Sequence, residues 1–300
     1  MNVKNIILSV FCLMVSSNRA TAQLNILNAK TPEEIGLKTE DQLASDNDQP
    51  LPYGFIDNRD VLWSKTTWEI IDLDERINFP LYYPIDTNNI GVERRSLYDV
   101  LIKNIKNKNI EQVYADSYFT EKRTLSDIEA SLIYSDTTDL GISQFNAGEA
   151  IDPQYIRKFT LDAADIEEWR IRGYWFLDKR SGELKYRLLG IAPVANEARS
   201  KAFPDDASDT KVELFWVWYP STREVLHKAN AFNRKNTSRP VSYDHLLNSR
   251  RFNSIIYRED NDLGDRTIND YINDNALMQL LESDRIKEVI RNIEIDMWNY

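Results

Sequence analysis

The sequence has 300 residues and a net charge of −11, from 37 Lys and Arg against 48 Asp and Glu. A chain of this length can bury a large core without covalent cross-links. The acidic charge argues against nucleic acid and anionic membranes as partners, because both attract Lys and Arg. The nine glycines are few for a nucleotide-binding fold, which needs glycine turns around phosphates.

The first 22 residues have the pattern of a secretory signal peptide. Residues 6–15 form an apolar run that is too short to span a membrane, and small residues lead to an expected cleavage after Ala22. The only cysteine, Cys12, lies in this run behind Phe11, whereas a bacterial lipoprotein needs a small residue there. We therefore expect no lipidation, and a mature chain without cysteines or disulfides.

The mature chain is expected to begin with a flexible arm. Residues 23–52 are polar and rich in Asn, Asp, Glu and Thr, a composition that favours disorder, although such an arm can also order on a partner. No later stretch reaches about 18 apolar residues, so we predict no membrane span and a soluble product, periplasmic or external in a bacterium. Residues 53–300 are predicted to form a single α+β domain.

The first part of this domain is predicted to be helical over residues 96–135. Ser96 and Thr124 are each followed three residues later by an aspartate, a spacing typical of a capping box at a helix start. The apolar stripes that follow predict three helices, over residues 96–106, 110–118 and 125–134.

Two stretches around this helical region are less informative. Residues 53–90 contain Trp63 and Trp68 but mix helical and extended periodicity, so no element is assigned to them. Residues 136–153 are polar and contain two glycines, so we expect a loop.

The β region is predicted to span residues 166–232. Alternating apolar residues mark a strand that starts near Ile166. The polar stretch 178–183, with Gly182, then favours a hairpin turn into a return strand.

A second hairpin is expected after a loop over residues 196–210. A strand over residues 212–219 leads to Pro220, which presets a turn, and a return strand follows over 223–232. The two hairpins together predict a four-stranded antiparallel meander, with helices before and after it.

The strand over residues 212–219 has two apolar faces. Phe215 and Tyr219 lie on one face, because side chains alternate along a strand, and Trp216 and Trp218 lie on the other. Such a strand is either covered on both sides or offers one face to a partner, and Trp and Tyr are enriched where proteins meet. These four aromatic residues are our candidate partner-binding residues, with an internal strand as the alternative.

The C-terminal region, residues 242–298, is predicted to be helical. Ser242 is expected to cap a helix that runs to about residue 253, and two further helices follow over residues 268–281 and 284–298. The apolar stripes of these helices either pack on the core or form grooves for a partner.

No stretch carries a recognised catalytic or metal-binding pattern. His227 and His245 lack a third zinc ligand at a typical spacing, and there is no Gly-x-Ser-x-Gly or Walker A motif. The acidic run 260–265 resembles a calcium loop, but its glycine comes one position early and the twelfth position is Tyr271 rather than Glu. We therefore predict no catalytic residue, no cofactor and no metal, and a protein that is not an enzyme.

Two sequence blocks resemble a known family. One is residues 61–84, VLWSKTTWEIIDLDERINFPLYYP, and the other is residues 214–260, which end in the specific run NSRRFNSIIYRED. Their order and spacing are similar to those of the gliding-motility family GldN, also called PorN, of Bacteroidetes. The acidic C-terminal helices extend the likeness over nearly the whole mature chain.

The resemblance implies a structural component of the type IX secretion and gliding-motility machinery in the periplasm. It implies a ring complex with an outer-membrane lipoprotein of the GldK or PorK type, which would hold the protein at the outer membrane. It also implies contact with the periplasmic part of an inner-membrane motor protein of the GldM or PorM type. No catalytic residues follow from the family.

A secreted carbohydrate-binding module or glycoside hydrolase is the alternative function. The seven Trp and 15 Tyr could supply surfaces on which sugars stack, and the 48 acidic residues could supply a catalytic carboxylate pair. Quenching of tryptophan fluorescence by glycans would separate this alternative from a structural component.

Overall fold

The fold is known for most of the chain after the expected N-terminal arm. The computed structural model describes residues 40, 49–86, 95–203, 210–232, 241–262 and 264–297. The expected signal peptide, residues 1–22, and nearly all of the arm, residues 23–52, lie outside the described residues. Within the described residues, no helix combines the length and the apolar character needed to cross a membrane.

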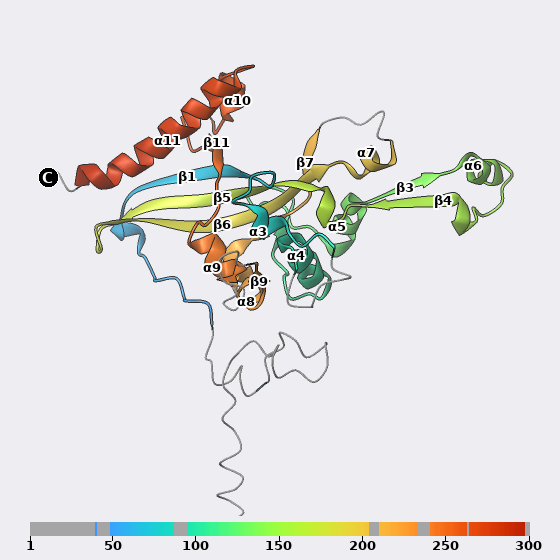
Figure 1. Ribbon diagram of the computed structural model, residues 1–300, viewed down its shortest axis with the longest axis horizontal. Helices are drawn as coiled ribbons and strands as arrows, with labels where there is room; N and C mark the ends of the chain where they lie inside the picture. The colour runs from blue at the N-terminus through green and yellow to red at the C-terminus, as the bar shows by residue number, and fades with distance from the viewer. Residues whose placement is uncertain are drawn as a thin grey trace, which may run out of the picture.

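Among the described residues, seven antiparallel strands form one large sheet at the centre of the molecule (Figure 1). The strand order is β11-β1-β5-β6-β8-β2, and β7 also pairs with β6. The strands are β1 Val61–Asp72, β2 Val113–Tyr114, β3 Ile133–Thr137, β4 Ile156–Thr160, β5 Ile166–Asp178, β6 Glu183–Asn196, β7 Lys211–Glu213, β8 Trp216–Trp218, β9 Asn230–Ala231, β10 Val241–Ser242 and β11 Ile255–Glu259.

Helices pack on this sheet and extend beyond it, so the α+β class expected from the sequence is confirmed. In Figure 1, α4, α8 and α9 lie below the long strands and α11 lies above them. The helices are α3 Phe79–Tyr82, α4 Leu97–Lys106, α5 Leu125–Leu132, α6 Asp139–Asn146, α7 Ala198–Ala202, α8 Tyr219–Lys228, α9 Tyr243–Asn248, α10 Ile268–Tyr271 and α11 Ala276–Met297, with 3-10 turns η3 Asn58–Asp60, η4 Pro153–Tyr155 and η5 Ala163–Asp165.

The hairpin of β5 and β6 is the longest pairing in the sheet, and it lies where alternation predicted it. Gly182 in its turn has φ of +65°, a left-handed value that glycine adopts without strain. Trp169 and Ile171 of β5 are fully buried in the main core. These apolar side chains fix the register, because a slip by one residue would turn them to the other face.

The β1 strand occupies a stretch to which the sequence assigned no element. It is a central strand, paired with β5 on one side and β11 on the other. Trp68 and Ile71, which point to opposite faces, are both fully buried. A strand that is covered on both faces loses the simple alternation on which the assignment depended.

The expected four-stranded meander is not found, because its last strand is a helix. The predicted return strand over residues 223–232 is wrong: α8 begins at Tyr219 and continues to Lys228. Pro220 lies in the first turn of α8, where its fixed φ and missing N–H are tolerated. Thr222 and Leu226, one turn apart, are fully buried, which is helical spacing.

The two capped helices predicted in the first half are confirmed, whereas the short helix predicted between them is wrong. Ser96 Oγ accepts from Asp99 N at the start of α4, and Thr124 forms a reciprocal capping box with Asp127 at the start of α5. The helix expected over residues 110–118 is instead the short strand β2 and a turn. The loop expected over residues 196–210 contains the short helix α7.

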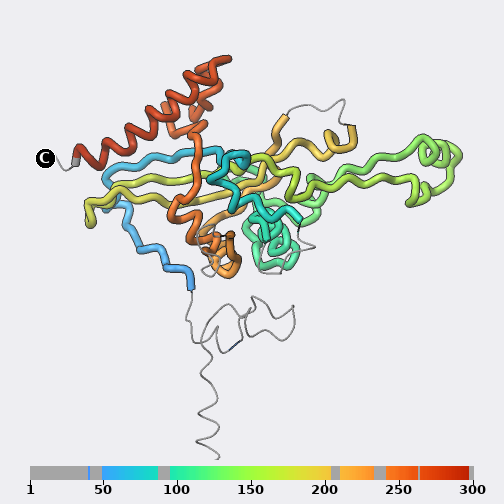
Figure 2. Tube along the Cα trace, in the orientation of Figure 1, coloured from blue at the N-terminus to red at the C-terminus, as the bar shows by residue number. Residues whose placement is uncertain are grey.

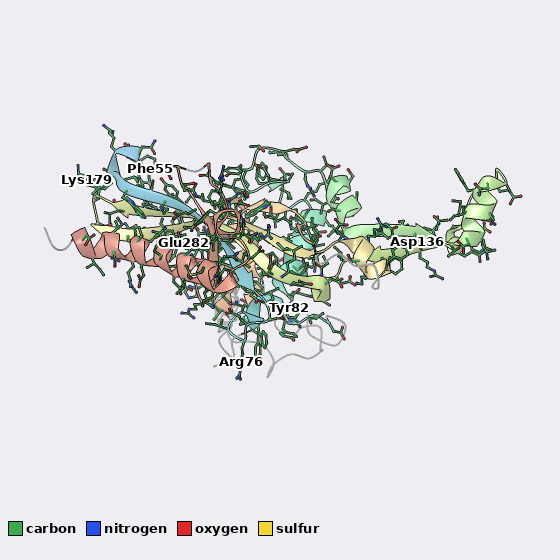
Figure 3. The ribbon with its side chains drawn as sticks, turned by 90° about the horizontal axis from the view of Figure 1, so that it is seen from above. Phe55, Arg76, Tyr82, Asp136, Lys179 and Glu282 are labelled. Atoms are coloured by element: carbon green, nitrogen blue, oxygen red, sulfur yellow. The ribbon has the colours of Figure 1, made fainter. Side chains whose placement is uncertain are left out.

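A two-stranded arm, defined as residues 133–160, projects from the body of the molecule (Figure 2). Its strands β3 and β4 pair over their full length and carry α6 at the far end. In Figure 3, Asp136 lies partway along this arm, and Lys179, in the turn after β5, lies toward the opposite end of the molecule. The expected loop over residues 136–153 is therefore wrong.

The C-terminal helices differ from the sequence expectation in length. Ser242 Oγ accepts from His245 N, as expected for a cap, but α9 ends at Asn248 rather than near residue 253. The chain then forms β11 and the short helix α10. In place of two helices over residues 268–281 and 284–298, one continuous helix, α11, runs to Met297.

Candidate interaction surfaces

Three of the four candidate partner-binding residues are enclosed by their own chain. Phe215, Trp216 and Tyr219 are fully buried, and Trp218 remains partly exposed. Phe215 and Tyr219 belong to the main core, whereas Trp216 belongs to a small cluster with Trp68. Both faces of the strand are thus covered, as in the alternative of an internal strand, and partner binding by these residues stays a prediction.

Tyr219 is held in a buried polar network. Its hydroxyl donates to Asp244 Oδ1 at 2.8 Å and accepts from Asn248 Nδ2 at 2.9 Å. Arg223 donates to both oxygens of Asp244, at 2.9 and 3.1 Å. Burial, followed by the Asp244 carboxylate, raises the pKa of Tyr219, so the phenol stays protonated. This network joins α8 to α9 and serves the fold.

Trp218 lies at one end of a row of side chains that crosses the sheet. Arg258 on β11 is opposite Trp68 on β1, and Trp68 is opposite Arg172 on β5. Arg172 is opposite Gly190 on β6, which is opposite Trp218 on β8. Residues in one register share a face of the sheet, so these five positions form a continuous row.

Phe119, in the loop that follows β2, covers the part of this row around Gly190 and Trp218. A Cβ atom on Gly190 would lie 2.5 Å from Phe119 Cζ, so the close approach of the ring requires glycine there. The Phe119 ring centroid is 4.8 Å from that of Trp218, in edge-to-face contact. Phe119 itself has φ of +61°, an uncommon value outside glycine that turns its side chain onto the sheet.

The end of the arm exposes apolar side chains. Leu140 and Phe145 of α6 are 64% and 68% exposed, and Ile142 is 47% exposed. Gly141 faces the arm strands instead, because a Cβ there would meet Thr137 Cγ2 at 2.7 Å. We call Leu140, Ile142 and Phe145 the arm tip. Because these large apolar groups are open to solvent, the arm tip is a candidate contact surface.

A second exposed apolar surface lies on the first turns of α11. Its members are more than two-fifths exposed: Leu277, Met278, Leu280 and Leu281. The same helix is fixed to the body by other side chains. Ile286 and Ile290 pack against Ile256, and Ser283 Oγ accepts from Ile256 N at 2.9 Å.

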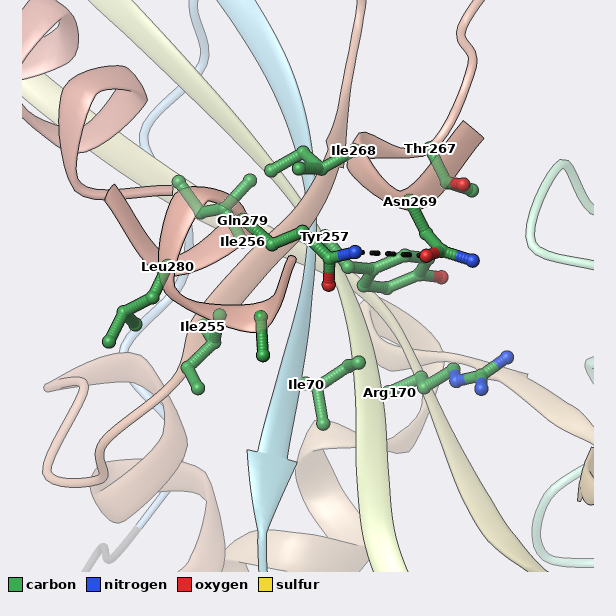
Figure 4. A pocket seen from close by; sticks show the side chains of 11 residues that line it. Ile70, Arg170, Ile255, Ile256, Tyr257, Thr267, Ile268, Asn269, Gln279 and Leu280 are labelled. Atoms are coloured by element: carbon green, nitrogen blue, oxygen red, sulfur yellow. Dashed lines mark hydrogen bonds between the residues drawn. The ribbon is translucent and has the colours of Figure 1, made fainter. Parts of the chain in front are cut away.

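A cavity of ≈ 460 Å³ lies between this helix and the sheet (Figure 4). Ile70, Ile255 and Leu280 form much of its apolar wall. Gln279 Nε2 donates to Asn269 Oδ1 at 2.9 Å at one side, so these polar groups satisfy each other. The cavity therefore has the character of an apolar groove beside the exposed surface of α11.

The described residues hold no cluster of three or more His, Cys, Asp or Glu side chains that could bind a metal ion. His227 lies in α8, and His245 is exposed in the first turn of α9. In the acidic run 260–265, Asn261 N donates to Asp265 Oδ1 and Asp265 N donates to Asn261 Oδ1. These side chains close a turn, as in the structural alternative to a calcium loop.

Sequence reasoning missed the arm tip and the arginines of the row. The arm tip lies in a stretch expected to be a loop; the available signal was Thr138 followed by Asp139, a pair typical of a helix start. For Arg172 and Arg258 no sequence signal existed, because their proximity depends on the register of three strands.

The fold and these surfaces define an α+β protein with exposed apolar groups at several places, among them the arm tip and the first turns of α11, and such groups are typical of proteins that assemble with others. The family model of the gliding motility associated protein GldN matches residues 56–299. Because this match covers more than half of the chain, the chain belongs to the GldN family, and the resemblance found in its sequence is confirmed. No curated protein matches the chain.

Proposed function

We propose that this chain is a periplasmic structural component of the type IX secretion and gliding-motility machinery, without catalytic activity. The observation that carries this proposal is the match to the GldN family over residues 56–299. The protein is exported by a signal peptide cleaved after Ala22. Cleavage leaves the N-terminal segment of residues 23–52, which is distinct from the two-stranded arm, and one α+β domain.

The proposed partners are an outer-membrane lipoprotein of the GldK or PorK type and the periplasmic part of a GldM or PorM type motor protein. With the lipoprotein the chain forms a ring, in which it is oligomeric and attached to the outer membrane. A component of this kind needs separate surfaces for separate contacts. The arm tip and the exposed side of α11, on different parts of the molecule, support such a role (Figure 1).

Trp218 is the residue we retain from the four aromatic candidates as a direct contact. It is partly exposed, whereas a contact by Phe215, Trp216 or Tyr219 would need their buried surroundings to open. If Trp218→Ala leaves partner binding unchanged in a folded protein, this assignment is wrong.

A crosslinked pull-down of the tagged full-length protein from native envelopes tests the function. We expect a GldK-type lipoprotein and a GldM-type membrane protein to co-purify at near-stoichiometric yield, as identified by mass spectrometry. Leu281→Asp on α11 should remove one of them while the protein stays folded, because an added charge disrupts an apolar contact. Recovery of the wild-type protein alone and monomeric would overturn the proposal.

A further inference from the structure

Arg172 and Arg258 converge on one residue of the loop that follows β2. Arg172 Nη1 donates to Ser117 O at 2.8 Å, and Arg258 Nη2 donates to Ser117 Oγ at 2.9 Å. Both guanidinium groups also face the ring of Trp68, with Cζ 5.1 Å and 4.0 Å from its centroid. Tyr118 lies 5.3 Å from each Cζ. The two cations are therefore held by the same loop residue and against the same aromatic rings.

In the part of the chain that the structure describes, no carboxylate oxygen lies within 4.0 Å of a side-chain nitrogen of either arginine. The neighbouring Arg170 on β5, by contrast, binds Glu213 at 2.7 Å. Arg172 and Arg258 lie on strands that flank β1, with Trp68 between them in the register. Within the described residues, their printed partners are Ser117 and aromatic rings rather than carboxylates.

The nearest carboxylates act only from a distance and are already engaged. Asp260 and Asp116 favour the charged form of Arg172, but Asp260 Oδ2 accepts from Thr66 N at 3.0 Å, and Asp116 accepts from Thr120 N. Burial lowers the pKa of Arg172, and the adjacent Arg258 lowers it further. The Nε atoms of both arginines are buried without a hydrogen-bond partner.

We propose that Arg172 and Arg258 form a binding site for a carboxylate of an acidic protein segment. One terminal nitrogen of each arginine, Nη2 of Arg172 and Nη1 of Arg258, makes no hydrogen bond within the described residues and is not among the buried atoms without a partner. In the proposed complex, Nη2 of Arg172 and Nη1 of Arg258 each donate to the carboxylate, so the two arginines together supply one donor for each of its oxygens. A bound carboxylate would also remove the repulsion between the two cations.

A segment of a protein suits this site better than a nucleic acid does. Nucleic acids bind through many phosphates and need an extended basic surface, whereas this chain carries a net charge of −11. The site offers two cations framed by Trp68 and Tyr118. Such a frame fits one or two acidic side chains.

Calorimetric titration of the folded protein with a short blocked polyglutamate peptide, at low ionic strength, tests the site. Wild type is expected to bind, and Arg172→Met and Arg258→Met should each weaken binding by roughly tenfold or more. Arg187→Met is the matched control, because Arg187 also stacks on an aromatic ring, 4.8 Å from Tyr53, and carries the same charge. Equal weakening by the control would overturn a specific site.

Inorganic phosphate is the second probe. Binding of phosphate without binding of the peptide would overturn the carboxylate assignment. Arg258→Lys keeps the positive charge but replaces the planar guanidinium group by an ammonium group. Weaker peptide binding by this variant, with an unchanged unfolding midpoint, supports the proposal. If the variants instead lower the midpoint by several degrees and bind the peptide as wild type does, the arginines only hold the loop. The proposed carboxylate site does not depend on the proposed function. A pull-down that recovered no partner would therefore not contradict this site.

Discussion

Glu69 on β1 and Arg250, just after α9, form a bidentate ion pair. The two residues are 181 positions apart in the sequence. The two hydrogen bonds measure 3.1 and 2.7 Å, and Glu69 is fully buried. Ser254 Oγ also donates to the Glu69 carboxylate. The two sequence blocks that carry the family resemblance, residues 61–84 and 214–260, thus meet at this pair, so Glu69, Arg250 and Ser254 serve the fold.

Glu69→Gln is expected to lower the free energy of unfolding by about 2–4 kcal/mol, because it leaves a partly buried Arg250 without its counter-charge. Urea denaturation measures this change. Glu288→Gln is the control, since the pair of Glu288 with Arg291 is exposed and should change stability by less than about 0.5 kcal/mol. Similar effects of the two substitutions would contradict a structural role for the buried pair.

Gly190→Ala should destabilise the protein by about 1–3 kcal/mol, because the new methyl group would overlap the Phe119 ring. In a Phe119→Ala background the same substitution should cost much less, since the overlapping ring is gone. A double-mutant cycle of unfolding free energies measures this coupling. Additive effects of the two changes would show that Phe119 does not cover Gly190.

Asp178 should make the stability depend on pH in the acid range. Its carboxylate accepts from Lys185 Nζ at 2.6 Å and from Arg180 N at 3.0 Å, and these bonds lower the pKa of Asp178 to about 2. The stabilisation is therefore fully present above the unfolded pKa of about 3.9 and is lost as the pH falls toward 2.

The measurement is the difference in urea midpoint between wild type and Asp178→Asn at several pH values. The difference should be constant near neutral pH and shrink as the pH falls from about 4 to about 2. A difference that stays constant over this acid range would show that Asp178 is not held as a carboxylate by Lys185.

Phe145→Asp at the arm tip should leave stability within about 0.5 kcal/mol of wild type, because Phe145 is 68% exposed. If the arm tip contacts a partner, the same variant should lose that partner in the crosslinked pull-down. Ser143→Asp, on the same helix, adds the same charge without removing an apolar group and is the control. Unchanged recovery of every partner with Phe145→Asp would exclude the arm tip as a contact.

Local signals predicted the parts of the fold that depend on nearby residues. The caps at Ser96 and Thr124 were predictable because the bonding atoms lie within three residues of each other. The β5–β6 hairpin was predictable because its alternation and its turn are contiguous in the sequence. The helix α8 was missed because Pro220 suits a turn and a first helical turn equally well.

The remaining errors come from long-range packing. Trp216 resembles a surface aromatic in the sequence, but Phe119 and Trp68 enclose it only once the loop after β2 folds over the sheet. The arm was missed because a projecting hairpin buries little, and so its strands show no strong alternation. The apolar stripe predicted the helical structure of α11. It did not predict which apolar side chains of this helix are exposed, because core and surface positions carry the same residue types.

The arm leads directly into the longest strand pairing of the sheet: β4 ends at Thr160, and β5 begins at Ile166. Tension applied at α6 would act on β3 and β4 together, because α6 lies between these paired strands in the chain. At the base it pulls β5 lengthwise against β1 and β6, where many hydrogen bonds would have to break at once. A load applied at the arm tip would therefore meet the most extensive strand pairing of the sheet.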